Sequence, residues 1–130
     1  MSSEHQQEAQ YHTTEIMKDL PFSEAVSVGN MLYLSGQIGM DSSMKLVSGG
    51  IAAETRQVME NIKATLERYG SSLDHVIKAT VMLADISEWE EMNRVYVQFF
   101  SKHLPARSAL GANGLAMGAR VEIECIAVLK

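Results

Sequence analysis

The C-terminal segment RVEIECIAV, residues 120–128, places the strongest constraint on how this chain can fold. Side chains of different character alternate along it, which is the period of a β-strand. One face of that strand is apolar throughout, with Val121, Ile123, Cys125, Ala127 and Leu129. The opposite face begins acidic and ends apolar, with Glu122, Glu124, Ile126 and Val128. We therefore expect helices to cover the first face and a second subunit to pack against the other.

The rest of the chain alternates between strand and helix patterns. Strands are expected at 9–14, on either side of a turn at 29–30 within 23–38, and at 76–85, 106–112 and 120–128. Helices are expected over 51–69, ended by Gly70, and over 86–100, capped by Asp85 or Ser87. Each helix carries a buried apolar stripe, made of Ile51, Val58, Met59, Ile62, Leu66 and Tyr69 in the first and of Ile86, Trp89, Met92, Tyr96, Phe99 and Phe100 in the second.

This order of elements, β-β-β-α-β-α-β-β, predicts an α+β fold in which both helices cover one face of the sheet. The 130 residues suffice for one core. We expect a flexible tail over 1–8 and a single domain over 9–130.

Composition argues against several classes of function. The formal net charge is −5, from 16 acidic and 11 basic residues that are dispersed along the chain, so nucleic-acid binding is not expected. Cys125 is the only cysteine and lies in a strand pattern, which indicates a buried thiol and no internal disulfide. The histidines His5, His12, His75 and His103 are scattered, so no zinc site is expected.

Nothing in the sequence indicates a membrane segment or an export signal. No apolar run approaches the roughly 18 residues of a membrane helix. The first ten residues, MSSEHQQEAQ, lack the basic and then apolar order of a signal peptide. A cytoplasmic location is therefore the expectation.

Arg107, in the segment LPARSAL, is the residue that most needs an explanation. On an alternating strand it shares a face with two small neighbours, Ala109 and Gly111, which leave space beside its guanidinium. If the last two strands form a hairpin, the glutamates of 120–128 lie near Arg107. Two interpretations remain open from spacing alone: a cross-strand Arg–Glu pair that neutralises an interface, or an arginine that binds a carboxylate with both nitrogens.

Three segments resemble the RidA/YjgF family of reactive intermediate (enamine/imine) deaminases: VGNMLYLSGQIGMD, the stretch from ETRQVMENIK to NRVYVQFF, and LPARSALGANGLAMGARVEIECIAV. Together they cover roughly residues 20–130. The resemblance implies a chorismate mutase-like fold and a homotrimer with its sites in clefts between subunits. It also implies hydrolysis of short-lived 2-imino acids, such as 2-iminobutyrate and 2-iminopropionate, to 2-keto acids and ammonia, without a metal or an organic cofactor.

The resemblance assigns roles to particular residues. Arg107 matches the family's substrate-carboxylate arginine, and Glu122 matches the acid that positions a water. Ser35 and Gly36, in SGQI, match a strand end that lines the pocket, and Asn93 matches another pocket position. For Ser35 and Asn93 a purely structural role, in a strand-end hydrogen bond or in helix packing, is an equal alternative.

Two substrate-pocket positions depart from the family pattern. Phe22 stands where a tyrosine is common, which removes a hydroxyl but keeps an aromatic wall, and Ala109 stands where a cysteine is common. These departures leave open a non-catalytic trimer that senses small carboxylates. An endoribonuclease, which the acidic balance disfavours, and a more specialised deaminase are further alternatives.

Overall fold

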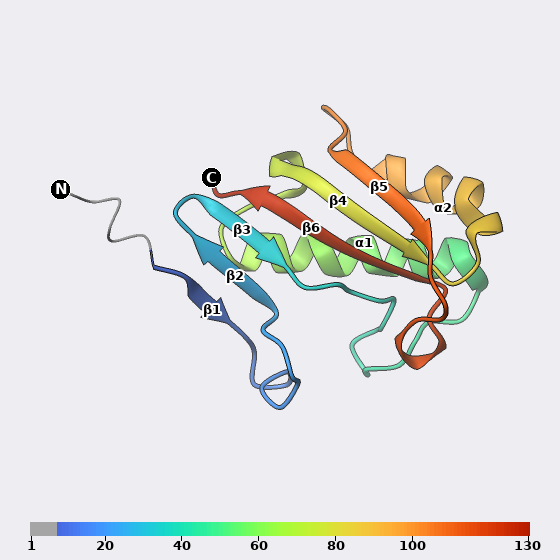
Figure 1. Cartoon of the computed structure of the whole chain (residues 1–130), viewed down its shortest axis with the longest axis horizontal. Helices are drawn as coiled ribbons and strands as arrows, with labels where there is room; N and C mark the ends of the chain where they lie inside the picture. The colour runs from blue at the N-terminus through green and yellow to red at the C-terminus, as the bar shows by residue number, and fades with distance from the viewer. Residues whose placement is uncertain (1–7) are drawn as a thin grey trace.

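The computed structural model describes residues 8–130, so all but the last residue of the tail predicted over 1–8 lies outside the described residues. Six strands form one sheet in the order β1-β2-β3-β6-β4-β5 (Figure 1). The strands are β1 (Gln10–His12), β2 (Ala25–Val28), β3 (Met31–Leu34), β4 (Val76–Leu83), β5 (Ala106–Gly111) and β6 (Val121–Val128). The helices are α1 (Gly50–Arg68) and α2 (Trp89–Tyr96). Short 3₁₀ turns occupy Leu73–His75, Ile86–Glu88, Val97–Phe99 and Ala116–Gly118.

The predicted order of strands and helices is confirmed, but the hairpin considered for the last two strands does not form. β5 and β6 do not form a hairpin, because β6 lies between β3 and β4 and is antiparallel to both. β5 instead pairs parallel to β4 at the edge of the sheet. A parallel pair needs a crossover connection, and α2 supplies it between β4 and β5. The apolar face of β6 thereby reaches the centre of the sheet.

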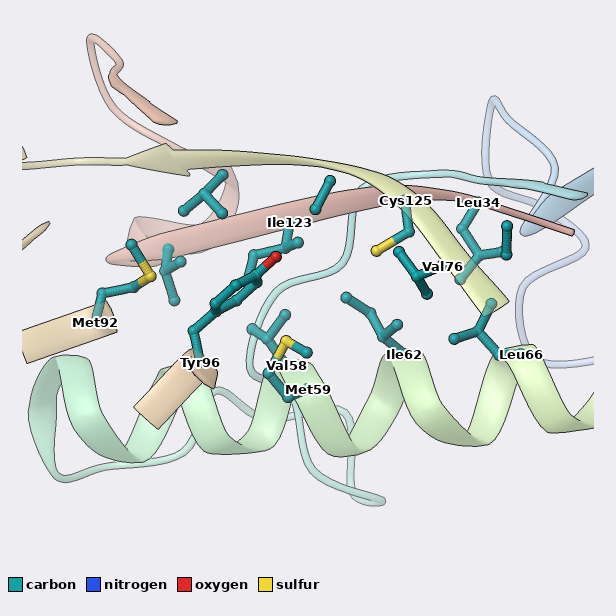
Figure 2. Close-up of a cluster of buried hydrophobic side chains, with 14 of the residues drawn as sticks. Leu34, Val58, Met59, Ile62, Leu66, Val76, Met92, Tyr96, Ile123 and Cys125 are labelled. Atoms are coloured by element: carbon teal, nitrogen blue, oxygen red, sulfur yellow. The ribbon is translucent and has the colours of Figure 1, made fainter. Parts of the chain in front are cut away.

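Both helices pack on the same face of the sheet, as predicted (Figure 1). The apolar row of β6 is buried at Val121, Ile123, Cys125 and Ala127, and it meets the stripe of α1. Figure 2 shows Val58, Met59, Ile62 and Leu66 of α1 pointing toward β4 and β6, with Met92 and Tyr96 of α2 beside them. At roughly 25 cal/mol per Å² of apolar surface removed from water, this burial dominates the stability of the fold.

The stripe predicted for the second helix is only partly buried. Met92 is fully buried and Tyr96 is 3% exposed, whereas Ile86 is 50% and Trp89 is 43% exposed. The physical reason is that the chain turns between Ile86–Glu88 and α2, where Asp85 accepts a hydrogen bond from the Ser87 backbone N–H at 2.9 Å. The prediction of a buried core position is therefore wrong for Ile86 and Trp89.

The opposite face of the sheet is not covered by either helix. It carries Tyr33 (41% exposed), Leu110 (45% exposed) and the mixed row of β6 that includes Glu124 and Ile126. No helix within residues 8–130 is both long enough and apolar enough to cross a membrane.

Candidate functional site

Glu122 lies on the uncovered face of β6, directly over Gly36. Residue 36 follows β3, and mutual backbone hydrogen bonds between Gln37 and Ile123, at 2.9 and 3.0 Å, hold the two segments together. A β-carbon on residue 36 would collide with the Glu122 carboxylate. A side chain at residue 36 would therefore push the flexible end of Glu122 away, and glycine leaves the carboxylate in place beside the backbone.

A cavity of about 570 Å³ opens beside this carboxylate. Its walls are the segment 14–22 before β2, the loop 36–44 after β3, one side of α1 and the turn at 116–117. Phe22, Gly36 and Glu122, three of the residues predicted for the site, all line it. No ion pair within residues 8–130 involves Glu122, so its carboxylate is available to a water or a ligand.

The floor of the cavity is fixed by a buried carboxylate that sequence analysis did not single out. Glu24, 6% exposed, accepts hydrogen bonds from Arg68 Nη1 at 2.8 Å and from Tyr69 Oη at 2.7 Å. The hydrogen bond to Glu24 raises the pKa of Arg68, while burial and then Glu24 raise the pKa of Tyr69. Both donors therefore stay protonated, and the charge of Arg68 is matched by Glu24.

Arg107 lies elsewhere, on the helix-covered face of the sheet. In register it stands beside Ala79, which pairs with Cys125, whereas Glu122 pairs with Met82 on the other face. A cross-strand Arg107–Glu122 pair is thus excluded within one chain: β4 separates their strands and their side chains leave opposite faces. Of the two interpretations that spacing left open, the cross-strand Arg–Glu pair is therefore wrong within one chain.

Aromatic rings, not an acid, surround the Arg107 guanidinium. Its Cζ lies 4.8 Å from the centroid of the Tyr96 ring and 5.9 Å from that of Trp89. Both distances are within the range of cation–π attraction. Among the described residues, no ion pair involves Arg107. Its charge is therefore left for a ligand.

Asn93 belongs to the same side of α2, because residues 89, 93 and 96 are spaced four and three apart. The buried Asn93 Oδ1 and Tyr96 Oη have no hydrogen-bond partner within residues 8–130. Burial raises the pKa of Tyr96 to about 12, so the phenol is neutral. The sequence pattern predicts both Trp89 and Tyr96 as core residues, which is right for Tyr96 and wrong for Trp89. Helical spacing carries no signal that separates a core position from one beside Arg107.

A single chain therefore carries two separate groups of candidate residues. The cavity group contains Phe22, Gly36 and Glu122, and the arginine group contains Arg107 with Asn93 on the neighbouring helix. The sequence from residue 13 to residue 129 matches the family described as Endoribonuclease L-PSP. The chain belongs to this family, which is the RidA/YjgF family.

Curated and solved members of the RidA/YjgF family are similar over most of their length. The human 2-iminobutanoate/2-iminopropanoate deaminase is 45% identical over 109 residues, which are 83% of this chain and 80% of that protein. The crystal structure of the yeast protein YEO7 has a TM-score of 0.89 at 39% identity and covers 95% of this chain and 100% of its own. RidA from the Antarctic bacterium Psychrobacter sp. PAMC 21119 has a TM-score of 0.82 at 40% identity, with 92% and 94% covered. The α+β fold is thus that of the RidA/YjgF structures.

Ser35 and Ala109, also predicted for this RidA/YjgF site, both contact other parts of the same chain. Ser35 Oγ donates to the Ser23 carbonyl at 2.6 Å, and its backbone N–H donates to the Glu24 carbonyl at 3.1 Å. This is the strand-end hydrogen bond considered as the alternative for Ser35. Ala109 lies two residues after Arg107 on the same face and packs against the core.

Proposed function

We propose that this chain hydrolyses reactive 2-imino acids, such as 2-iminobutanoate and 2-iminopropanoate, to 2-keto acids and ammonia. The observation that carries the proposal is the Glu122 carboxylate, which lies over Gly36 without an ion pair at the mouth of a large cavity. The human and bovine relatives, which are 2-iminobutanoate/2-iminopropanoate deaminases, support the same reaction. The family description names a nuclease instead. No histidine lines the cavity within residues 8–130, and the net charge of −5 does not favour RNA.

The residues suit an addition of water to an imine. Arginine stays charged at any working pH and can hold both oxygens of a carboxylate in one plane, so Arg107 would fix the substrate. Protonation of the imine nitrogen makes its carbon electrophilic, and Glu122 would orient a water toward that carbon and take its proton. The resulting carbinolamine carries the new hydroxyl. Glu122 would then return that proton to the nitrogen. As the carbon–nitrogen bond breaks, ammonia leaves, and the hydroxyl loses its own proton to water and becomes the carbonyl of the 2-keto acid.

We further propose that the complete site forms between subunits of a homotrimer. Arg107 and Glu122 leave opposite faces of the sheet, so one chain cannot place both on one substrate. β5 lies at the sheet edge, and the uncovered face exposes Leu110 on β5 and Tyr33 on β3. A rotational trimer would let Arg107 of the partner subunit face the Glu122 cavity. Solution mass should be close to three times 14.3 kDa.

Two other sequence predictions remain proposals. We propose a cytoplasmic location, supported by the single buried cysteine, which suits a reducing compartment. We also propose that residues 9–130 fold as one domain, supported by one continuous sheet and one core cluster.

The test follows the lifetime of an imine. A 2-imino acid is generated from its amino acid by an oxidase in the presence of semicarbazide, which traps imine that the protein has not yet hydrolysed. Wild type should lower the yield of trapped product. Arg107→Ala should reduce kcat/KM roughly a hundredfold, as expected for two lost charge-assisted hydrogen bonds, and Glu122→Gln should reduce kcat by a similar factor.

Arg94→Ala serves as the matched control. Arg94 is an exposed arginine of α2, and its replacement by alanine removes the same charge as Arg107→Ala does. It should behave as wild type. If Arg107→Ala quenches the imine as fast as wild type, the proposed carboxylate site is wrong. Saturable binding of 2-keto acids without any acceleration of hydrolysis would instead identify a sensor.

A further inference from the structure

Arg68 is a second arginine beside the Glu122 cavity, and its guanidinium is of the kind that binds carboxylates. It belongs to the last turn of α1 and lines the cavity, with 44% of its side chain exposed. The ionisable side chains among the described lining residues are those of Glu24, Asp41, Arg68 and Glu122. A free guanidinium on this wall would attract both the Glu122 carboxylate and the carboxylate of a substrate.

The Glu24 carboxylate holds this cation from a fixed position. Arg68 Nη1 lies 2.8 Å from each oxygen of Glu24, and Tyr69 Oη donates to the same carboxylate at 2.7 Å. The backbone of Glu24 is fixed in turn, because its N–H donates to the His12 carbonyl at 2.8 Å and its carbonyl accepts from the Ser35 N–H at 3.1 Å. Since Glu24 is only 6% exposed, water competes little for these contacts.

A second free cation would interfere with the proposed reaction in two ways. The mechanism requires Arg107 of the partner subunit to hold the carboxylate while the imine carbon faces Glu122. A carboxylate bound to Arg68 would lie on the cavity floor instead. A Glu122 side chain drawn to Arg68 would be a weaker base, because a nearby cation stabilises the charged form of a carboxyl group. Both effects lower turnover, and neither lowers binding.

We propose that Glu24 is a positioning residue that withholds Arg68 from the substrate, so that Arg107 alone binds the substrate carboxylate. Glu24 acts through Arg68 and touches no reacting atom. This inference rests on the proposed function in one respect, namely that Arg107 binds the carboxylate. Neutralising Glu24 then opens a second binding position, at Arg68, where the substrate is held but not hydrolysed.

Binding of 2-oxobutanoate, a stable product, tests for this second position without turnover. Calorimetry on the full chain starts from Arg107→Ala, which should bind the keto acid roughly a hundredfold more weakly than wild type does. Adding Glu24→Gln frees Arg68 and keeps an acceptor oxygen for Tyr69, and it should restore binding about tenfold. Adding Arg68→Met as well should abolish this gain. Hydrolysis of 2-iminobutanoate should not recover in either combination.

The pH profile of kcat/KM gives a second readout, which a packing defect alone would not move. In otherwise wild-type protein, Glu24→Gln should shift the acid limb to lower pH by roughly half a unit, because a free Arg68 stabilises the charged form of Glu122. Adding Arg68→Met should restore the wild-type profile. The other charged groups that flank Glu122 among the described residues are the same in all these variants, namely Arg120, Glu124 and Asp41.

Glu67→Gln is the matched control. Glu67 is exposed, precedes Arg68 on α1 and does not line the cavity, so its neutralisation removes the same charge without freeing Arg68. In the Arg107→Ala protein it should leave binding of 2-oxobutanoate unchanged.

Equal binding after Glu24→Gln and Glu67→Gln would overturn the inference, as would a gain that survives Arg68→Met. Wild-type affinity of Arg107→Ala for 2-oxobutanoate would overturn it as well. If the gain appears but wild type hydrolyses no imine faster than buffer does, the proposed function is wrong and the role of Glu24 in withholding Arg68 stands.

Discussion

Arg107 lies beside two aromatic rings, and this arrangement has a consequence for binding. A guanidinium without an acidic partner keeps its full charge for a ligand, while the rings restrict its position. Tyr96 is in the core, so its removal would disturb the fold, but Trp89 is half-exposed. Trp89 is therefore the residue through which the position of Arg107 can be tested.

We expect Trp89→Leu to raise KM for 2-iminobutanoate about twofold to fivefold with little change in kcat. The reason is the loss of a contact of about 0.5–1 kcal/mol, the usual strength of an exposed cation–π pair. Trp89→Phe keeps an aromatic face and should recover most of the affinity. Steady-state kinetics measure the split between KM and kcat, and thermal unfolding of both variants reports any structural damage.

A purely structural role for Trp89 would give a different pattern: the melting temperature would fall and KM would stay the same. Equal KM values for the leucine and phenylalanine variants would also contradict a positioning role.

Gly36 shows which part of the site could be predicted at the scale of single residues. The resemblance identified Gly36 and Glu122 together, and the structure explains the pairing by a collision that any side chain at residue 36 would cause. Trp89 could not be assigned, because an apolar stripe has the same spacing in a core and beside a ligand site. Glu24 was missed because its partners, Arg68 and Tyr69, lie more than 40 residues away in the sequence.

At the scale of elements, the strands and helices follow from local periodicity, and the sequence was sufficient to predict them. The partners of the strands were not predictable in the same way, because the nine residues 112–120 before β6 do not determine where β6 inserts. One signal was available. Two strands that are joined by a helix usually pair in parallel. β4 and β5, which α2 joins, do so.

The burial of β6 beneath α1 predicts how stability depends on pH. Cys125 of β6 is 3% exposed, and burial, with a smaller contribution from Glu124, raises its pKa to about 12 from a normal value of 9.0. The folded state therefore resists loss of this proton more than the unfolded state does. The contribution of the protonated Cys125 thiol to the stability of the folded state is complete below pH 9. It is lost as the pH rises from about 9 to about 12.

We expect the free energy of unfolding of wild type to fall by about 1 kcal/mol more than that of Cys125→Ala between pH 7 and pH 10. Denaturant titrations at several pH values measure this difference. The chain has no other cysteine, and Tyr96, whose pKa is also raised to about 12 by burial, titrates in both proteins. Parallel pH curves for the two proteins would show that Cys125 does not titrate differently on folding.

At the scale of the whole molecule, the single chain presents the two halves of the proposed site on opposite faces of one sheet. Sequence patterns predicted an uncovered face and a subunit interface, but a hairpin between the last two strands would have put both halves in one chain. The actual strand order separates them. This separation makes the proposed trimer a requirement for activity rather than an addition to it.

Mixed trimers test that requirement directly. Arg107→Ala and Glu122→Gln chains are co-expressed with different tags, and trimers that carry both tags are isolated. If Arg107 of one subunit serves the Glu122 cavity of the next, a mixed trimer of either composition contains one site with both native residues and two without. We expect these trimers to show about one third of the wild-type kcat per trimer, with a wild-type KM.

Each variant expressed alone should form trimers that are nearly inactive, which serves as the control for recovery. Sites contained within single subunits predict that the mixed trimers are as inactive as their parents, because every chain then lacks one of the two residues. Activity well above one third would imply that one native residue of the pair is enough for catalysis. Recovery near one third, with KM unchanged, is expected only if Arg107, the proposed carboxylate ligand, and Glu122, the proposed water-positioning acid, come from different chains.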